Sequence, residues 1–161
     1  MFWTMKKIIL INALLLICSI IKAQDYRPLG EFGTDTIAYM HYNFVDRKDQ
    51  YIGQPFKKLI NDCEWEPFRM DPTSTYPYAP GAKGKSYVYG ADLKYLYPSD
   101  MIHYRKIGKP FATLEISFPP PHPEWEIIQK MMPYPDDDRV WALKMGDMII
   151  EDIKLLIEPS N

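Results

Sequence analysis

The amino-acid sequence predicts an α+β fold, a small antiparallel sheet of three to five strands with helices packed on one face. Three observations support this prediction. Apolar residues recur at helical spacing early in the chain, two runs of alternating residues occupy its middle, and an apolar segment rich in β-branched residues lies near its end. The chain contains no internal repeat, and its order of elements does not match a doubly wound nucleotide-binding fold.

The first 23 residues have the three parts of a secretory signal peptide. Lys6 and Lys7 precede an apolar run over residues 8–21, and Ala23 stands before the polar Gln24. Polar residues interrupt the run, which is shorter than the roughly 20 apolar residues that a membrane-spanning helix needs. We therefore expect cleavage after Ala23 and export to the periplasm or the outer surface.

Residues 24–161 are predicted to form a single domain with one core. Removal of the leader takes away three of the 19 basic residues and none of the 21 acidic ones, which leaves a net charge of −5. This acidic balance argues against nucleic acid as a partner and against attraction to anionic lipid. We expect no transmembrane segment in this range.

Cys63 is the single cysteine after the leader, so the exported chain cannot form an internal disulfide. Packing must then hold the domain together, and we expect Cys63 to act as a small buried apolar residue. Cys18 lies inside the leader. Lipid attachment at Cys18 is an alternative, although bacterial lipid attachment prefers a small residue where Ile17 stands.

Two helices are expected in the first third of the chain. Residues 35–51 carry an amphipathic stripe with a possible cap at Thr34 or Asp35, and Gly53 ends it. Alternation at residues 37–41 leaves a strand as the alternative. Pro55 then opens a short second helix, because its missing N–H is not needed there. The apolar face of this second helix consists of Phe56, Leu59 and Ile60.

The middle of the chain predicts a sheet. Residues 64–70 are at most an extended piece at a sheet edge, because they contain Pro67, and residues 71–85 are expected to form a loop. Alternation then predicts a strand over residues 87–96, a partner strand at Met101–Ile107, a turn at residues 108–110, and a strand over Phe111–Phe118. The prolines of residues 119–123 are expected to end the last of these strands.

The last third predicts a helix, a second short helix and a strand. Glu124–Met132 has helical spacing of apolar residues, and residues 136–138 can start the next helix. Val140, Trp141 and Met145 are expected to pack inward, and Gly146 ends the helix. The segment Met148–Ile157 fits either a helix or a strand, and its β-branched residues favour the strand.

Residues able to carry chemistry do not form a recognisable pattern. His41, His103 and His122 lack the spacing of a metal site. Cys63 follows a helix rather than opening one, which does not favour a reactive thiolate. The three aspartates at residues 136–138 lack the alternate spacing of a calcium loop, and Glu124 and Glu126 point to different sides of a helix. We predict no catalytic residue, metal or cofactor, and a non-enzymatic role.

Tyrosines gather around the expected loop and the strand that follows it. Tyrosine joins a flat apolar ring to a polar tip, so exposed clusters serve protein interfaces and sugar stacking. The alternative is that these rings build the core. As candidate binding residues we select Tyr76, Tyr78, Tyr87, Tyr89 and Trp125.

Residues 51–62, with the pattern Tyr-Ile-Gly-x-Pro-Phe-x-x-Leu-x-x-Asp, resemble a segment of small exported proteins of Gram-negative bacteria. Those proteins share a leader that ends in Ala-Gln and a late apolar segment similar to residues 149–157. The resemblance covers about half of the exported chain. It implies a small exported α+β domain of unknown role and brings no catalytic residue.

The favoured hypothesis is an exported, non-catalytic domain that binds another protein, for example an immunity protein against a toxin delivered to the periplasm. A glycan-binding module that uses exposed Tyr and Trp side chains is the alternative. A hydrolase with a site built from scattered residues ranks third.

Overall fold

The computed structural model of the chain describes residues 25–75, 87–123 and 136–158. The predicted helix at Glu124–Met132 and the leader lie outside these residues. The chain forms, in order, the elements η1 (Leu29–Phe32), α2 (Thr36–Met40), η2 (His41–Val45), η3 (Lys48–Gln50), α3 (Phe56–Asp62), β1 (Arg69–Thr75), β2 (Tyr87–Lys94), α4 (Pro98–Ile107), β3 (Phe111–Pro123), α6 (Asp138–Lys144) and β4 (Asp152–Glu158).

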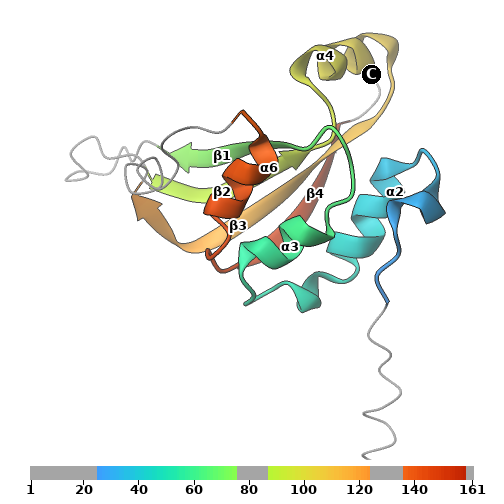
Figure 1. Cartoon of the computed structure of the whole chain (residues 1–161). Coiled ribbons are helices and arrows are strands. Elements are labelled where there is room, and N and C mark those ends of the chain that lie inside the picture. Colours follow the sequence, from blue (N-terminus) through green and yellow to red (C-terminus); the bar gives the residue numbers. More distant parts are fainter. Residues whose placement is uncertain (1–24, 76–86, 124–135, 159–161) are drawn as a thin grey trace, which may run out of the picture.

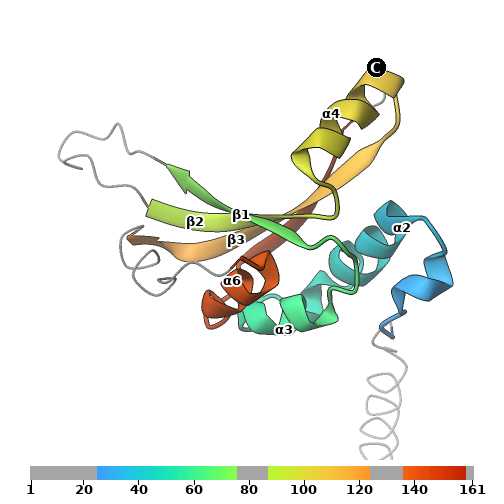
Figure 2. The same ribbon diagram turned by 45° about the horizontal axis from the view of Figure 1, so that its top comes forward.

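The four strands form one antiparallel sheet in the order β1-β2-β3-β4. Helices α2, α3 and α6 lie together against one face of this sheet, and α4 rises from the far end of the sheet, away from them (Figures 1 and 2). The predicted α+β class and the antiparallel four-stranded sheet are therefore confirmed. None of the described helices is long and apolar enough to cross a membrane.

The core lies between the sheet and the layer of α2, α3 and α6. Its centre is a set of aromatic rings packed edge to face, in which Trp65 contacts both Tyr39 and Phe44 with ring centroids 6.0 and 5.7 Å apart. Met70, Leu93 and Leu114 are neighbours in strand register and supply the sheet side of this core. Each such side chain taken out of water contributes about 1.5–3 kcal/mol.

The expected helix over residues 35–51 is helical but not continuous. Its predicted cap is confirmed, because the Asp35 carboxylate accepts a hydrogen bond from the Ala38 N–H at 2.9 Å. After Met40 the chain widens into the π-helical η2, where the Asp46 N–H bonds the His41 carbonyl, and it then tightens into η3. The strand alternative for residues 37–41 is wrong.

The short second helix is confirmed as α3, with Pro55 at the N-cap position and Phe56, Leu59 and Ile60 buried. Gly53, with φ +74°, makes the turn before it. The backbone around this turn pairs with the end of the chain, since the N–H groups of Gly53 and Phe56 donate to Ile150 and Met148. These bonds tie the start of α3 to the segment before β4.

The loop predicted over residues 71–85 is wrong for residues 71–75, which belong to β1. The expected extended piece therefore lies a few residues later than predicted, at Arg69–Thr75. Pro72 is tolerated inside it because β1 is an edge strand and its missing N–H costs no bond to the sheet.

Strand β2 is confirmed, but its alternation is interrupted by a bulge. The pairing with both neighbours shifts between Val88 and Gly90, so that Val88 is buried and Tyr89 is exposed. A side chain at Gly90 would collide with the carbonyl oxygen of Ile116 on the next strand. Glycine is therefore required for the strands to approach each other here.

The predicted partner strand at Met101–Ile107 is wrong, because Pro98–Ile107 forms helix α4. Local signals outweigh the apolar alternation: Pro98 stands in the first turn and Asp100 favours the positive helix start. Gly108 ends the helix in the left-handed conformation, at φ +67°.

The third strand does not stop at the prolines. Strand β3 begins at Phe111 as predicted but runs to Pro123, and His122 pairs with Val88. The fixed φ of proline falls in the extended region, so prolines can continue a strand wherever no N–H is needed for pairing.

The end of the chain forms α6 and then β4, as predicted. Met145 is buried as predicted and Trp141 is half-buried, but Val140 is exposed, so the predicted inward face of the helix is only partly confirmed. Ala142 is the buried residue within the helix itself. The segment after residue 148 becomes a strand from Asp152 onward, which confirms the preference given to its β-branched residues.

Candidate functional site

The residues selected from the sequence as binding candidates are only partly placed. Tyr76, Tyr78 and Trp125 lie outside the described residues. Tyr87 is half-buried on β2, and Tyr89 is 37% exposed at the bulge of the same strand. The structure brings these two together on one strand, and their role in binding stays a prediction.

Of the groups considered for catalysis, Cys63, His41 and His103 lie at separate places in the fold, and Glu124 and Glu126 lie outside the described residues. Cys63 is buried, as predicted, and its thiol donates to the Leu59 carbonyl at 3.3 Å. Burial raises the pKa of this thiol, which keeps it protonated. His41 pairs with Asp46 at 3.2 Å and His103 lies on α4. Within residues 25–75, 87–123 and 136–158 no group of three His, Cys, Asp or Glu side chains could hold a metal ion.

The aspartates at residues 136–138 serve the fold. Asp137 caps α6 by accepting a hydrogen bond from the Arg139 N–H at 2.8 Å. Asp138 pairs with Arg69 and accepts the Met70 N–H on β1. The run therefore starts a helix, as expected, and fastens it to the sheet.

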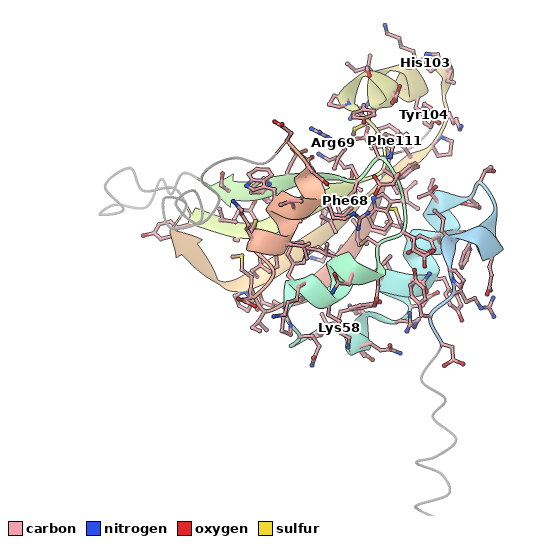
Figure 3. All side chains as sticks on the ribbon, viewed as in Figure 1. Lys58, Phe68, Arg69, His103, Tyr104 and Phe111 are labelled. Atoms are coloured by element: carbon pink, nitrogen blue, oxygen red, sulfur yellow. The ribbon has the colours of Figure 1, made fainter. Side chains whose placement is uncertain are left out.

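Helix α4 is the feature that the sequence analysis missed. None of its ten residues is buried. Ile102 and Ile107 are 51% and 57% exposed, although their side chains are apolar. Figure 3 shows the helix, marked by His103 and Tyr104, above Arg69 and Phe111 of the sheet. A helix normally buries an apolar stripe against its own protein, and α4 does not.

Polar tethers hold α4 in place. Arg105 donates two hydrogen bonds to the Glu158 carboxylate at the end of β4, at 2.6 and 2.5 Å, and its guanidinium lies over the Phe111 ring. The Arg105 hydrogen bond holds the pKa of Glu158 below its ordinary value. At the other end of the connection, the Lys109 ammonium donates to the Tyr104 hydroxyl. The helix is therefore positioned by charge and capping rather than by burial.

A pocket of about 280 Å³ lies beneath α4 on the face of the sheet away from the helical layer. Met70 and Leu93 point toward the core, so their strand neighbours Arg69 and Lys94 point to this opposite face. The lining has an apolar part and a charged part, namely Leu96, Pro98, Met101 and Ile102, and Arg69, Asp71, Lys94 and Arg105.

Every cation of this pocket has a carboxylate partner. Lys94 pairs with Asp71 at 2.6 Å, Arg69 pairs with Asp138 at 3.2 Å, and Arg105 holds Glu158. A ligand that carries only negative charge would therefore compete with carboxylates already in place. The arrangement suits an apolar group inserted between ion pairs, with polar groups around it.

A second and wider hollow, the Tyr95–Tyr104 groove, lies along the other flank of α4 and has a volume of about 580 Å³. It combines two tyrosine rings with hydroxyls of Thr34 and Thr36 and the carboxylates of Asp35 and Glu66. Aromatic rings beside such polar groups can stack on and hydrogen-bond a sugar. Both carboxylates already accept hydrogen bonds from the backbone N–H groups of Ala38 and Phe68.

Sequence signals for this region existed but were read differently. A helix start is signalled by Pro98, and its end is signalled by Gly108. Between them, Asp100 in the first turn and Arg105 in the last turn match the charges of the helix dipole. These four positions predict the helix; its exposure and the two hollows beside it depend on the rest of the fold.

Comparison of the chain with protein-family models, with curated proteins and with solved structures finds no match in any of the three.

Proposed function

We propose that this protein is an exported, non-catalytic domain that binds a partner protein through α4 and the pocket beneath it. An immunity protein against a toxin delivered to the periplasm is its concrete version. The observation that carries the proposal is the apolar exposure of α4, a helix that buries none of its residues. Exposed apolar groups that gather beside a hollow are typical of protein-binding surfaces.

The composition of the pocket supports a protein partner. Met101 and Ile102 offer an apolar centre, while the ion pairs of Lys94 and Arg105 surround it. Interfaces between proteins combine an apolar centre with a polar rim in the same way. A partner side chain that enters the pocket would exclude water from its apolar centre and from the surrounding ion pairs.

The sheet face beside the pocket supports a basic partner. Asp71, Asp92 and Glu115 are direct neighbours in the register of β1, β2 and β3. Like charges at opposed positions destabilise a sheet. Part of this cost is offset by Lys94 on Asp71, by the Thr73 hydroxyl on Asp92 and by Lys154, which lies opposite Glu115 on β4. A basic partner surface would offset the rest, and the net charge of −5 would speed its approach.

Export is part of the proposal. Tyr26, two residues after Gln24, is held against the helical layer, because its hydroxyl forms hydrogen bonds with the Tyr39 hydroxyl and the Asp62 carbonyl. Cleavage after Ala23 would leave this anchor intact. N-terminal sequencing of the protein recovered from the periplasm is expected to begin at Gln24, and an intact Met1 on protein found in the cytosol would contradict export.

Co-purification tests the binding surface. The full chain, affinity-tagged at its C-terminus, is expected to retain a stoichiometric partner from the cell envelope. Ile102→Asp with Ile107→Asp should abolish retention. The matched control is Val140→Asp with Leu143→Asp, which places the same charges at exposed apolar positions of α6. Equal retention by both double variants, or no stoichiometric partner for the unchanged chain, would contradict the proposal.

A glycan-binding role is the second candidate, and the Tyr95–Tyr104 groove favours it. On a glycan array, Tyr104→Ala should abolish binding, while Tyr97→Ala on the other flank of α4 should leave it unchanged. Tyr76→Ala and Tyr78→Ala test the residues that the sequence singled out. Absence of any glycan signal, or a signal indifferent to Tyr104, would remove this candidate.

A further inference from the structure

The two edges of the sheet are treated differently. The edge of β1 is closed by α6, because the Asp138 carboxylate accepts the Met70 N–H at 3.1 Å and also pairs with Arg69. Pro72, in the same strand, has no N–H to offer. A further strand therefore cannot add at residues 69–72 of this side without displacing α6.

The edge of β4 is closed only at its beginning. There Lys48 of η3 reaches the Asp152 carboxylate at 3.3 Å. From Lys154 to Glu158, the backbone hydrogen bonds among the described residues join β4 to β3 and to no other segment. Leu156 and Ile157 are 49% and 45% exposed. Consecutive residues of a strand point to opposite faces, so Leu156 is uncovered on the outer face and Ile157 at the end of the inner face, while Leu155 packs partly against the core.

An open apolar edge strand is a template for pairing, and proteins either block it or use it. Among the residues that the structure describes, β1 is blocked over residues 69–72 and β4 is open beyond Asp152. We propose that two copies of the chain pair antiparallel through residues 154–158 of β4, which joins their four-stranded sheets into one across a two-fold axis at Leu156. This proposal is separate from the function assigned to α4.

The charges of Lys154 and Glu158 and the alternation of side chains between the two faces favour this register of pairing between the copies. A two-fold axis at Leu156 places Lys154 opposite Glu158 of the second copy, and the same contact repeats on the other side of the axis. Opposite charges facing each other across a strand pair stabilise it. Within its own chain Lys154 lies 3.6 Å from Asp152 and Glu158 holds Arg105, so the contact between copies would add to these pairs. Leu156 then meets its own copy on one face of the sheet, and Leu155 meets Ile157 of the second copy on the other.

Other registers are less favourable. An axis at Lys154 would set two lysines against each other, and an axis at Leu155 would place Asp152 opposite Glu158. An axis between two residues would set outward-facing side chains against inward-facing ones, which the pleat does not allow. An axis at Leu156 also uses only the stretch that η3 leaves free.

A charge-exchange experiment tests the proposal. Protein purified from cells that express the full chain is expected to form a dimer in sedimentation-velocity runs at micromolar concentration. Lys154→Glu places Glu opposite Glu, and Glu158→Lys places Lys opposite Lys, so each variant alone should be monomeric. Mixed in equal amounts, the two variants should form a heterodimer, because both contacts then join opposite charges.

Circular dichroism confirms that each variant is folded before it is mixed. This control matters because Glu158→Lys also removes the tether to Arg105. The proposal would be overturned if the unchanged protein stayed monomeric up to about 100 µM, a concentration about a hundred times higher than that of the first runs. It would also be overturned if the folded variants failed to associate on mixing.

Cross-linking gives an independent test. Leu156→Cys brings two thiols together at the axis and should form a disulfide-linked dimer in mild oxidant. Ile149→Cys is the matched control, an exposed apolar position before β4 that lies off the edge. Cys63 is buried and does not interfere. Cross-linking of Leu156→Cys no faster than that of Ile149→Cys would overturn the two-fold contact.

Discussion

The layer of α2, α3 and α6 and the helix α4 belong to one domain but are held in place by different forces. The layer buries large rings such as Trp65 and Phe44 between helices and sheet, and dense packing keeps it in place. Helix α4 buries no residue and depends on caps and on the Arg105–Glu158 pair. Most of the packing that stabilises the described domain is therefore concentrated on the face of the sheet that carries α2, α3 and α6.

Substitution in the core should produce the largest effect. Trp65→Ala removes an indole that contacts three aromatic rings and donates to the Lys94 carbonyl, so we expect a loss of about 3–5 kcal/mol in the free energy of unfolding. Ile102→Ala on α4 should change it by less than about 0.5 kcal/mol. Urea denaturation measures both, and comparable losses would erase the contrast between the two regions.

Arg139 fastens α6 to the loop after α3 and should rank second. Its guanidinium donates to the carbonyls of Ile60, Cys63 and Trp65 and lies over the Phe68 ring. Arg139→Ala leaves those carbonyls without this donor and should cost about 1–3 kcal/mol in urea denaturation. Arg139→Lys, which keeps a charge but not the planar fork, is expected to recover only part of the loss.

Alkaline pH should weaken the helical layer before it affects α4. Burial raises the pKa of Tyr39 to about 12. The folded state thus keeps a proton that the unfolded chain releases near its ordinary pKa of 10. The stability associated with Tyr39 is present below pH 10 and is lost as the pH rises toward 12, by about 1 kcal/mol between pH 9 and 11. Burial also raises the pKa of Tyr26 and Tyr51 in the same layer, so their loss adds to it. Denaturation midpoints that do not fall over this range would contradict this assignment.

The smallest expected effect lies at α4 itself. The Arg105 hydrogen bond lowers the pKa of Glu158, so its contribution is present above the unfolded value of 4.5 and is lost as the pH falls through the folded value. Glu158→Gln should barely change global stability, because this pair is exposed. It should speed hydrogen exchange of α4 amides while α3 amides keep their rates, and unchanged α4 rates would show that the tether is unimportant.

Local structure is predictable from the sequence where a few neighbouring residues decide the outcome. Asp35 three residues before Ala38, Pro55 before an apolar face, and the alternation after Tyr87 act through contacts that are local in the chain. Prediction from the sequence fails at Pro72 and at the prolines after Phe118, because whether a proline is tolerated in a strand depends on which neighbour needs its N–H.

The candidate site was harder to predict than the fold. Tyrosines are numerous around β1 and β2, whereas α4 carries few distinctive residues, and the alternation of its apolar residues predicts a strand. Its capping residues were present at Pro98, Asp100 and Gly108, and they would have corrected the assignment. Nothing local, however, indicates that Ile102 and Ile107 stay exposed.

The class of fold, the positions of most helices and strands, and the burial of Cys63 follow from residues close together in the chain, because periodicity and capping act over a few residues. Three features follow from the folded arrangement instead. Asp138 accepts the Met70 N–H at the edge of β1, β4 has no further strand beside it among the described residues, and α4 lies over charged strand residues. Those outcomes join residues far apart in the chain, and the spacing of residues carries no information about which distant segments will meet.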